Sequence, residues 1–154
     1  MTAEGYQNGA WKSLLSELYL FNNGDTCDSS TGGWTAASGG SVGTTLDVAN
    51  GGTGPTYIQY AQVITNKAID FSQFNTLHIN VSSYSSTGTV TISTTSGGSA
   101  AASVTINAKK EFTLNIADCN DSYFIKLRTD GKQHNSNSWL STGFYADKIW
   151  LTKD

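Results

Sequence analysis

The sequence contains very little proline and little charge: one proline occurs in 154 residues, and Asp, Glu, Lys and Arg together make up 14%. The formal net charge is −3, and the densest group of cations is Lys126, Arg128 and Lys132. Strong nucleic-acid binding is therefore not expected, because phosphate contacts need concentrated lysine and arginine. No stretch approaches the roughly 20 apolar residues of a membrane-spanning helix, so membrane insertion is not expected either.

Residue types that carry most enzyme chemistry are also scarce. There are two histidines and two cysteines, and the sequence has no phosphate-binding loop. The carboxylates fall mostly in predicted turns, and spacing places no facing pair of the kind that glycosidases need. We therefore expect no catalytic activity. For Cys27 and Cys119, two free thiols and a disulfide between two loops both remain open.

The sequence is rich instead in short runs in which apolar and polar residues alternate, with turn-forming residues between them. In residues 74–84, Leu77 and Ile79 share one face, and His78 and Asn80 share the other. Period-two alternation predicts half-buried strands. Eight or nine strands are expected, within residues 17–21, 44–49, 56–64, 74–84, 89–94, 103–108, 111–117, 122–128 and 144–152. This pattern predicts an all-β fold: a jelly-roll β-sandwich of two antiparallel sheets, or a related Greek key.

One domain is expected. Residues 1–15 read as a lead-in segment with a short helical turn near Leu14 and Leu15, and residues 16–154 as a single β-sandwich binding domain. Residues 128–143 form the longest irregular stretch, and loops of that length are often functional. No signal peptide is visible, because the first residues lack a charged segment followed by an apolar core.

Aromatic residues provide the first candidate site. Trp139 lies in the 128–143 stretch together with several side chains that hydrogen-bond hydroxyl groups, and sugar rings stack on aromatic faces. The alternative is a tryptophan that holds a long loop against the core. Trp34 is expected in the core, and Trp150 is expected to face solvent or a neighbouring subunit. The candidate ligand-binding residues are Trp139, His134, Asn135, Asn137 and Arg128, with Tyr84 and His78 as alternatives on a sheet face.

Carboxylates provide the second candidate site. In residues 144–152, Asp147 alternates with Ile149 and Leu151, so it is expected on the inward face, where a carboxylate needs a partner. Calcium is one such partner, and Asp25 and Asp28 lie in a glycine-containing turn that could supply further oxygens. The alternative is that Asp25 and Asp28 only form Asx turns.

Three stretches resemble carbohydrate-binding modules with a jelly-roll, galactose-binding-like fold: LFNNGDTCDSSTGGWTAAS (20–38), AIDFSQFNTLHINVSSY (68–84) and GFYADKIWLTKD (143–154). The resemblance covers most of the chain and specifies fold better than ligand. It implies a structural calcium held by Asp25 or Asp28 and by Asp147. The stretch beginning YQNGAWKS also resembles modules at the ends of phage and prophage tail or fibre proteins.

The expected function is that of a non-catalytic module that binds a cell-surface glycan, as part of a phage tail or fibre or another surface-adhesion protein. The alternative is a structural virion decoration module that makes protein–protein contacts. The expected partner is a glycan or polysaccharide, with a homo-oligomer such as a trimer also compatible. The expected location is the virion or an extracellular surface.

Overall fold

The structure is a computed structural model that describes residues 2–7, 10–53, 60–130, 132–135 and 138–153. Almost all of the regular structure in these residues is β-strand, and the one helix, α1, is a single turn at Asp28–Thr31. The strands are β1 (Thr2–Gln7), β2 (Ala10–Leu15), β3 (Glu17–Asn22), β4 (Trp34–Ser38), β5 (Ser41–Val42), β6 (Leu46–Asp47), β7 (Asn50–Thr53), β8 (Tyr60–Thr65), β9 (Ile69–Asp70), β10 (Thr76–Tyr84), β11 (Gly88–Ser93), β12 (Ala102–Ile106), β13 (Glu111–Asn115), β14 (Ser122–Asp130), β15 (Lys132–Asn135), β16 (Ser138–Thr142) and β17 (Phe144–Thr152).

Two antiparallel sheets form the body of the molecule. The first sheet has the order β13-β10-β17-β6-β5, and β3 pairs with β17 on the same edge as β6. The second sheet has the order β12-β11-β14-β8-β4, and the short β9 pairs with β14. All pairings are antiparallel among the described strands, which confirms the all-β, two-sheet prediction.

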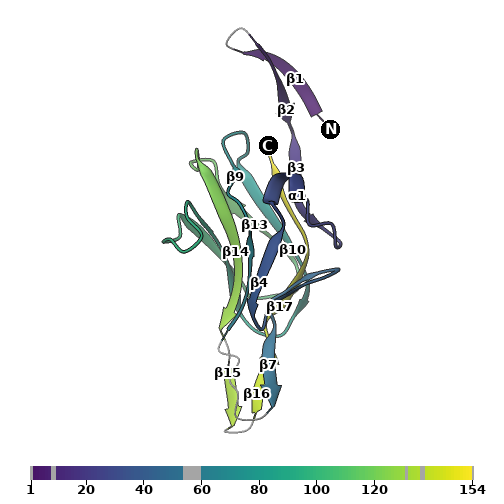
Figure 1. Ribbon diagram of the computed structural model, residues 1–154, viewed down its shortest axis with the longest axis vertical. Coiled ribbons are helices and arrows are strands. Elements are labelled where there is room, and N and C mark those ends of the chain that lie inside the picture. Colours follow the sequence, from purple (N-terminus) through teal and green to yellow (C-terminus); the bar gives the residue numbers. More distant parts are fainter. Residues whose placement is uncertain (1, 8–9, 54–59, 131, 136–137, 154) are drawn as a thin grey trace.

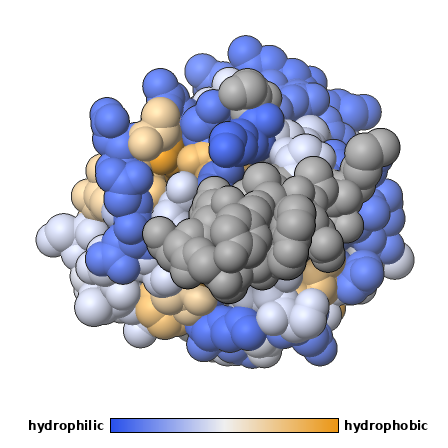
Figure 2. Space-filling model, turned by 90° about the horizontal axis from the view of Figure 1, so that it is seen from above, coloured by the Kyte–Doolittle hydropathy of each residue, from blue (hydrophilic) through white to orange (hydrophobic). Residues whose placement is uncertain are grey.

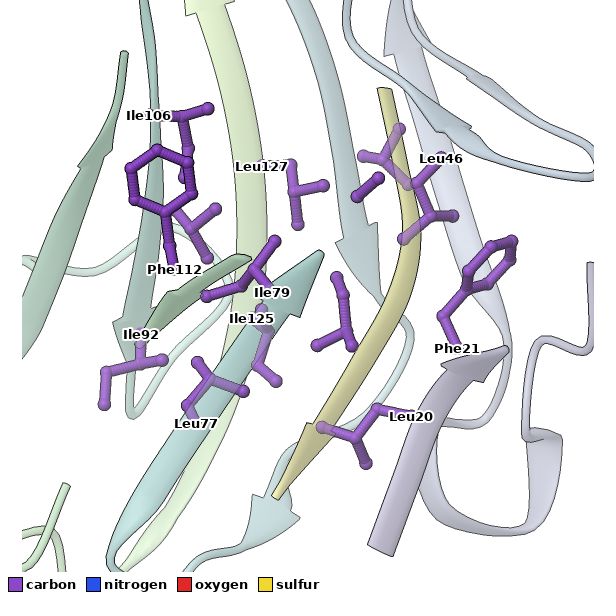
Figure 3. Close-up of a cluster of buried hydrophobic side chains, with 14 of the residues drawn as sticks. Leu20, Phe21, Leu46, Leu77, Ile79, Ile92, Ile106, Phe112, Ile125 and Leu127 are labelled. Atoms are coloured by element: carbon purple, nitrogen blue, oxygen red, sulfur yellow. The ribbon is translucent and has the colours of Figure 1, made fainter. Parts of the chain in front are cut away.

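The core lies between the two sheets, because each long strand turns alternate residues inward (Figure 3). Strand β14 shows this clearly: Tyr123, Ile125 and Leu127 are buried, and the residues between them are partly exposed. Trp34 is buried as predicted, and its indole Nε1–H donates a 3.0 Å hydrogen bond to the Leu20 carbonyl. Burying these apolar side chains is the main force that holds the sheets together.

Two smaller sheets lie at opposite ends of the long axis (Figure 1). At one end, β1 and β2 form a hairpin, so Leu14 and Leu15 lie in a strand rather than in the predicted helical turn. At the other end, β15, β16 and β7 form a three-stranded sheet. The described residues of 128–142 therefore lie in strands, and the prediction of an irregular loop is wrong for them. Strand β16 finds one of its two partners in β7, which is distant in sequence, and local composition does not reveal that pairing.

Hydrophilic residues cover much of the end that carries the β1–β2 hairpin, and hydrophobic residues appear there only as small separate groups (Figure 2). Within the described residues, the structure contains no helix of the length and apolarity that crossing a bilayer requires.

Candidate functional site

The residues predicted in the 128–143 stretch lie on two strands of the small three-stranded sheet. His134 and Asn135 are in β15, and Trp139 is in β16 opposite Gln133 and Gly52. Their side chains are outside the part of the structure that is described, and Asn137 lies outside the described residues altogether. Ligand binding by these four residues stays a prediction.

Arg128 and Tyr84 are described, and both are engaged within the protein. The Arg128 guanidinium lies 4.2 Å from the centre of the Tyr60 ring, and it donates hydrogen bonds to Asp130 (3.1 Å) and Gln62 (3.3 Å). Tyr84 packs partly against the core. Arg128 is on the second sheet and His78 on the first, so the fold does not bring these two predicted ligand-binding residues into one site.

His78 lies on the outer face of the first sheet, where three aromatic rings stack. The imidazole is stacked on Trp150 with ring centroids 4.7 Å apart and planes 6° apart, and Trp150 is stacked on Tyr19 with centroids 6.1 Å apart. We call Tyr19, Trp150 and His78 the ring stack. The three residues come from adjacent strands and are in register, because His78 pairs with Trp150 and Trp150 pairs with Tyr19.

Two hydrogen bonds fix the His78 ring within the stack. Its Nδ1 lies 2.9 Å from Glu111 Oε1, and its Nε2 lies 2.8 Å from the Thr152 hydroxyl. Only 16% of the His78 side chain is exposed, whereas the Glu111 side chain is 48% exposed. These contacts therefore hold the imidazole ring in one orientation.

The same outer face of the first sheet is hollowed near Thr113. The hollow has a volume of about 260 Å³, and we call it the polar hollow; its lining residues are Asn75, Thr76, Thr113, Asn115 and Ala117. None of these five side chains is ionisable. Thr113 lies directly opposite His78, on the side away from Trp150, and Asn115 lies directly opposite Thr76. The hollow therefore lies next to the ring stack on the same sheet face, although its lining does not include His78.

Asp147 was predicted to lie on the inward face of the sheet, and this prediction is wrong. A β-bulge interrupts the pairing of β10 with β17 between Asn80 and Val81, and it changes which residues of β17 point inward. Phe144 and Ala146 are buried before the bulge, Ile149 and Leu151 are buried after it, and Asp147 is partly exposed. Strict alternation cannot predict an inserted residue of this kind.

The three predicted calcium ligands each accept a hydrogen bond from the protein. Asp25 accepts from the Cys27 N–H (2.9 Å), Asp28 accepts from the Thr26 hydroxyl, and Asp147 accepts from the Asn80 amide (2.8 Å). The Asp25 contact is the predicted Asx turn. Within the described residues, no three His, Cys, Asp or Glu side chains are grouped as metal ligands. Calcium binding therefore stays a prediction, without a preassembled ligand set in this part of the chain.

Both cysteines are free thiols and are partly buried. Burial, together with the nearby Asp25 carboxylate, raises the pKa of Cys27 to about 11. Burial also raises the pKa of Cys119. These two thiols are therefore poor nucleophiles near neutral pH, because the thiolate is the reactive form.

Sequence reasoning placed His78 on a sheet face but missed the polar hollow. The sequence contained one signal for it: polar residues alternate along two predicted strands, Thr76 with His78 on one and Thr113 with Asn115 on the other. The sequence did not reveal that these two strands pair, with Thr76 opposite Asn115 and His78 opposite Thr113. No family model, curated protein or solved structure that was compared with this chain matches it, so the site is interpreted from its own chemistry.

Proposed function

We propose that this protein is a non-catalytic carbohydrate-binding module and that the polar hollow holds one sugar residue of a surface glycan. The observation that supports this most is an uncharged hollow of about 260 Å³, lined mainly by amide and hydroxyl side chains. Asparagine and threonine side chains donate to and accept from hydroxyl groups, which is what a neutral sugar offers. A few placed polar groups in a concave site are typical of small-ligand recognition.

The ring stack lies next to the hollow on the same sheet face, because His78 pairs with Thr113, which lines the hollow. A sugar in the hollow would meet the hydrogen-bonding groups of asparagine and threonine side chains and the methyl group of Ala117. The site is shallow, so we expect weak binding by a single module and stronger binding when several modules are displayed together.

Strand pairing is consistent with the jelly-roll type that the sequence suggested. In the main sheets, β11 pairs with β12, β10 with β13, β8 with β14 and β3 with β17, so each pair is nested in sequence inside the next. This nested order supports a jelly roll, in which antiparallel strand pairs wrap around a common core. Many functions occur on such folds, so the fold alone does not carry the proposal.

A chain of polar contacts runs from the Thr152 hydroxyl through the His78 imidazole to the Glu111 carboxylate. This chain resembles the arrangement that activates a nucleophile in some enzymes. Acyl transfer also needs N–H donors for the developing oxyanion. Strand β17 pairs with β10 on one edge and β3 on the other, and the next amide, Lys153 N–H, donates to the Ser16 carbonyl. Because the backbone donors near Thr152 are used by the sheet, we assign these three residues to holding the ring stack.

The proposal is tested by binding of the whole chain, displayed as a tetramer, to a broad array of bacterial and host glycans. We expect a specific set of glycans to bind. Asn115→Ala and Thr113→Val remove polar groups of the hollow and are expected to weaken binding about tenfold each. Thr105→Val is the matched control, because Thr105 is exposed on β12 of the other sheet.

Repeating the array with calcium and with a chelator tests the predicted site at Asp25, Asp28 and Asp147. A blank array with folded wild-type protein would contradict the carbohydrate-binding proposal. A stable trimer with a blank array would instead favour the virion decoration module, in which the same face makes protein contacts. Binding that survives both hollow variants would place the glycan elsewhere on the chain.

A further inference from the structure

We infer that the polar hollow recognises the acetamido group of an N-acetylhexosamine, rather than the hydroxyl groups of a plain hexose. This inference rests on the proposed carbohydrate binding and specifies the sugar class. An acetamido group presents a carbonyl acceptor, an N–H donor and a methyl group close together. The hollow presents a donor, a hydroxyl and a methyl group on neighbouring residues of one strand and the turn that follows it.

The donor is the side-chain amide of Asn115. The Ala117 backbone N–H donates a 2.9 Å hydrogen bond to Asn115 Oδ1, which fixes the orientation of the amide. The Nδ2 group then remains available as a donor, and Asn115 is exposed at the hollow. An amide nitrogen held in this way suits a carbonyl acceptor such as that of the acetamido group.

The acceptor and the apolar contact come from Thr113 and Ala117. Thr113 is exposed two residues before Asn115, on the same side of β13, and its hydroxyl can accept the acetamido N–H. Ala117 contributes a methyl group and is exposed. A plain hydroxyl placed against Ala117 would lose its hydration without gaining a hydrogen bond, whereas an acetyl methyl group would bury apolar surface there.

The charge of the site argues against an acidic sugar. The five residues that line the hollow contain no cation to compensate a carboxylate, and an unpaired charge loses hydration at a cost. The nearest acidic or basic residue on β13 is Glu111, whose carboxyl group is hydrogen-bonded to His78 Nδ1. A neutral N-acetylated sugar therefore fits the lining better than a uronic acid does.

The test measures binding of the whole chain to multivalent conjugates of N-acetylglucosamine, glucose and glucosamine, and of N-acetylgalactosamine and galactose. We expect the N-acetylated sugar of at least one series to bind about tenfold more tightly than its unacetylated counterpart. Asn115→Asp keeps the oxygen that accepts from Ala117 but removes the Nδ2 donor. We expect this variant to lose the preference, with its fold confirmed by circular dichroism.

Asn107→Asp is the control for the added charge, because Asn107 is exposed just after β12 on the other sheet. It is expected to keep the wild-type preference. Equal binding of acetylated and unacetylated sugars, or a preference that persists in Asn115→Asp, would overturn the acetamido assignment and leave carbohydrate binding standing. Wild-type protein that binds none of these conjugates and nothing on the glycan array would overturn both.

Discussion

His78 lies flat against Trp150 on the outer face of the first sheet, with ring centroids 4.7 Å apart and planes 6° apart. The two residues are direct cross-strand neighbours on β10 and β17. Cross-strand pairs are the units by which a sheet face is stabilised, and stacked rings are among the more favourable ones. His78 also pairs with Thr113, which lines the polar hollow, so the ring stack and the proposed site lie on the same sheet face.

A double-mutant cycle measures this relationship directly. We expect His78→Ala and Trp150→Ala to be coupled by about 0.5–1.5 kcal/mol of unfolding free energy, the size measured for aromatic pairs. Urea unfolding of the wild type, both single variants and the double variant gives the coupling. Pairing His78→Ala with Trp34→Phe is the control, because Trp34 packs against Phe21 in the core. Additive effects in the first cycle would show that the two rings do not stabilise each other.

A substitution of Trp34 tests whether the stability of the core can be lowered without changing sugar binding at the proposed site. Trp34→Phe removes the hydrogen bond to the Leu20 carbonyl and leaves that buried acceptor without its indole donor. We expect a loss of about 1–3 kcal/mol in the free energy of unfolding, with sugar binding unchanged for the folded protein. Urea unfolding and binding to the glycan array provide the two readouts. A binding loss equal to that of Asn115→Ala would contradict the separation.

The stability of the fold is expected to depend on pH through Asp47. Burial raises the pKa of Asp47 above its ordinary value of 3.8, against the opposing effect of hydrogen bonds from Ala49, Tyr145 and Ser41. Stability from a raised pKa is fully present below the unfolded value and is lost as pH rises through the folded value. Asp47→Asn keeps an oxygen for the Ala49 N–H but never ionises. We therefore expect this variant to gain stability relative to the wild type as pH rises above 3.8.

Asp70 is the matched control, because its pKa is lowered whereas that of Asp47 is raised. Hydrogen bonds from Ser72 lower the pKa of Asp70, so its stabilising contribution is present above the ordinary value of 3.8 and is lost as pH falls through the lower folded value. Asp70→Asn should therefore be less stable than the wild type at neutral pH, and the difference should vanish in acid. Urea unfolding at several pH values measures both variants. If the stability of Asp47→Asn and of Asp70→Asn relative to the wild type changed with pH in the same direction, the opposite pKa shifts assigned to Asp47 and Asp70 would be refuted.

Cys27 is expected to react slowly with thiol reagents at neutral pH. Its pKa of about 11 leaves very little thiolate near pH 8, whereas an ordinary cysteine is substantially ionised there. The labelling rate should rise with pH until about pH 11. Iodoacetamide labelling of Cys119→Ser, followed by mass spectrometry, isolates Cys27, and urea-unfolded protein provides the unprotected rate. A native rate at pH 8 equal to the unfolded rate would contradict the predicted protection.

The sequence predicts which residues of a strand point inward better than it predicts which strands pair with each other. Alternation in residues 74–84 correctly predicted inward and outward faces, because the period of two is a local property of the extended chain. Residues 128–143 were misread as a loop, because the pairing of β16 with β7 is a long-range property. The bulge at Asp147 was missed because an inserted residue leaves no mark in a simple alternation.

By itself, the sequence determined an all-β chain with two sheets, a buried Trp34 and a His78 on an outer sheet face. Apolar periodicity and the scarcity of charge are enough for that, since they decide which side of each strand is buried. Only the tertiary structure decided that Tyr19, Trp150 and His78 stack, and that Asn75, Thr76, Thr113 and Asn115 surround one hollow. Those neighbours depend on the pairing and register of strands far apart along the chain, which are selected by packing of the whole core.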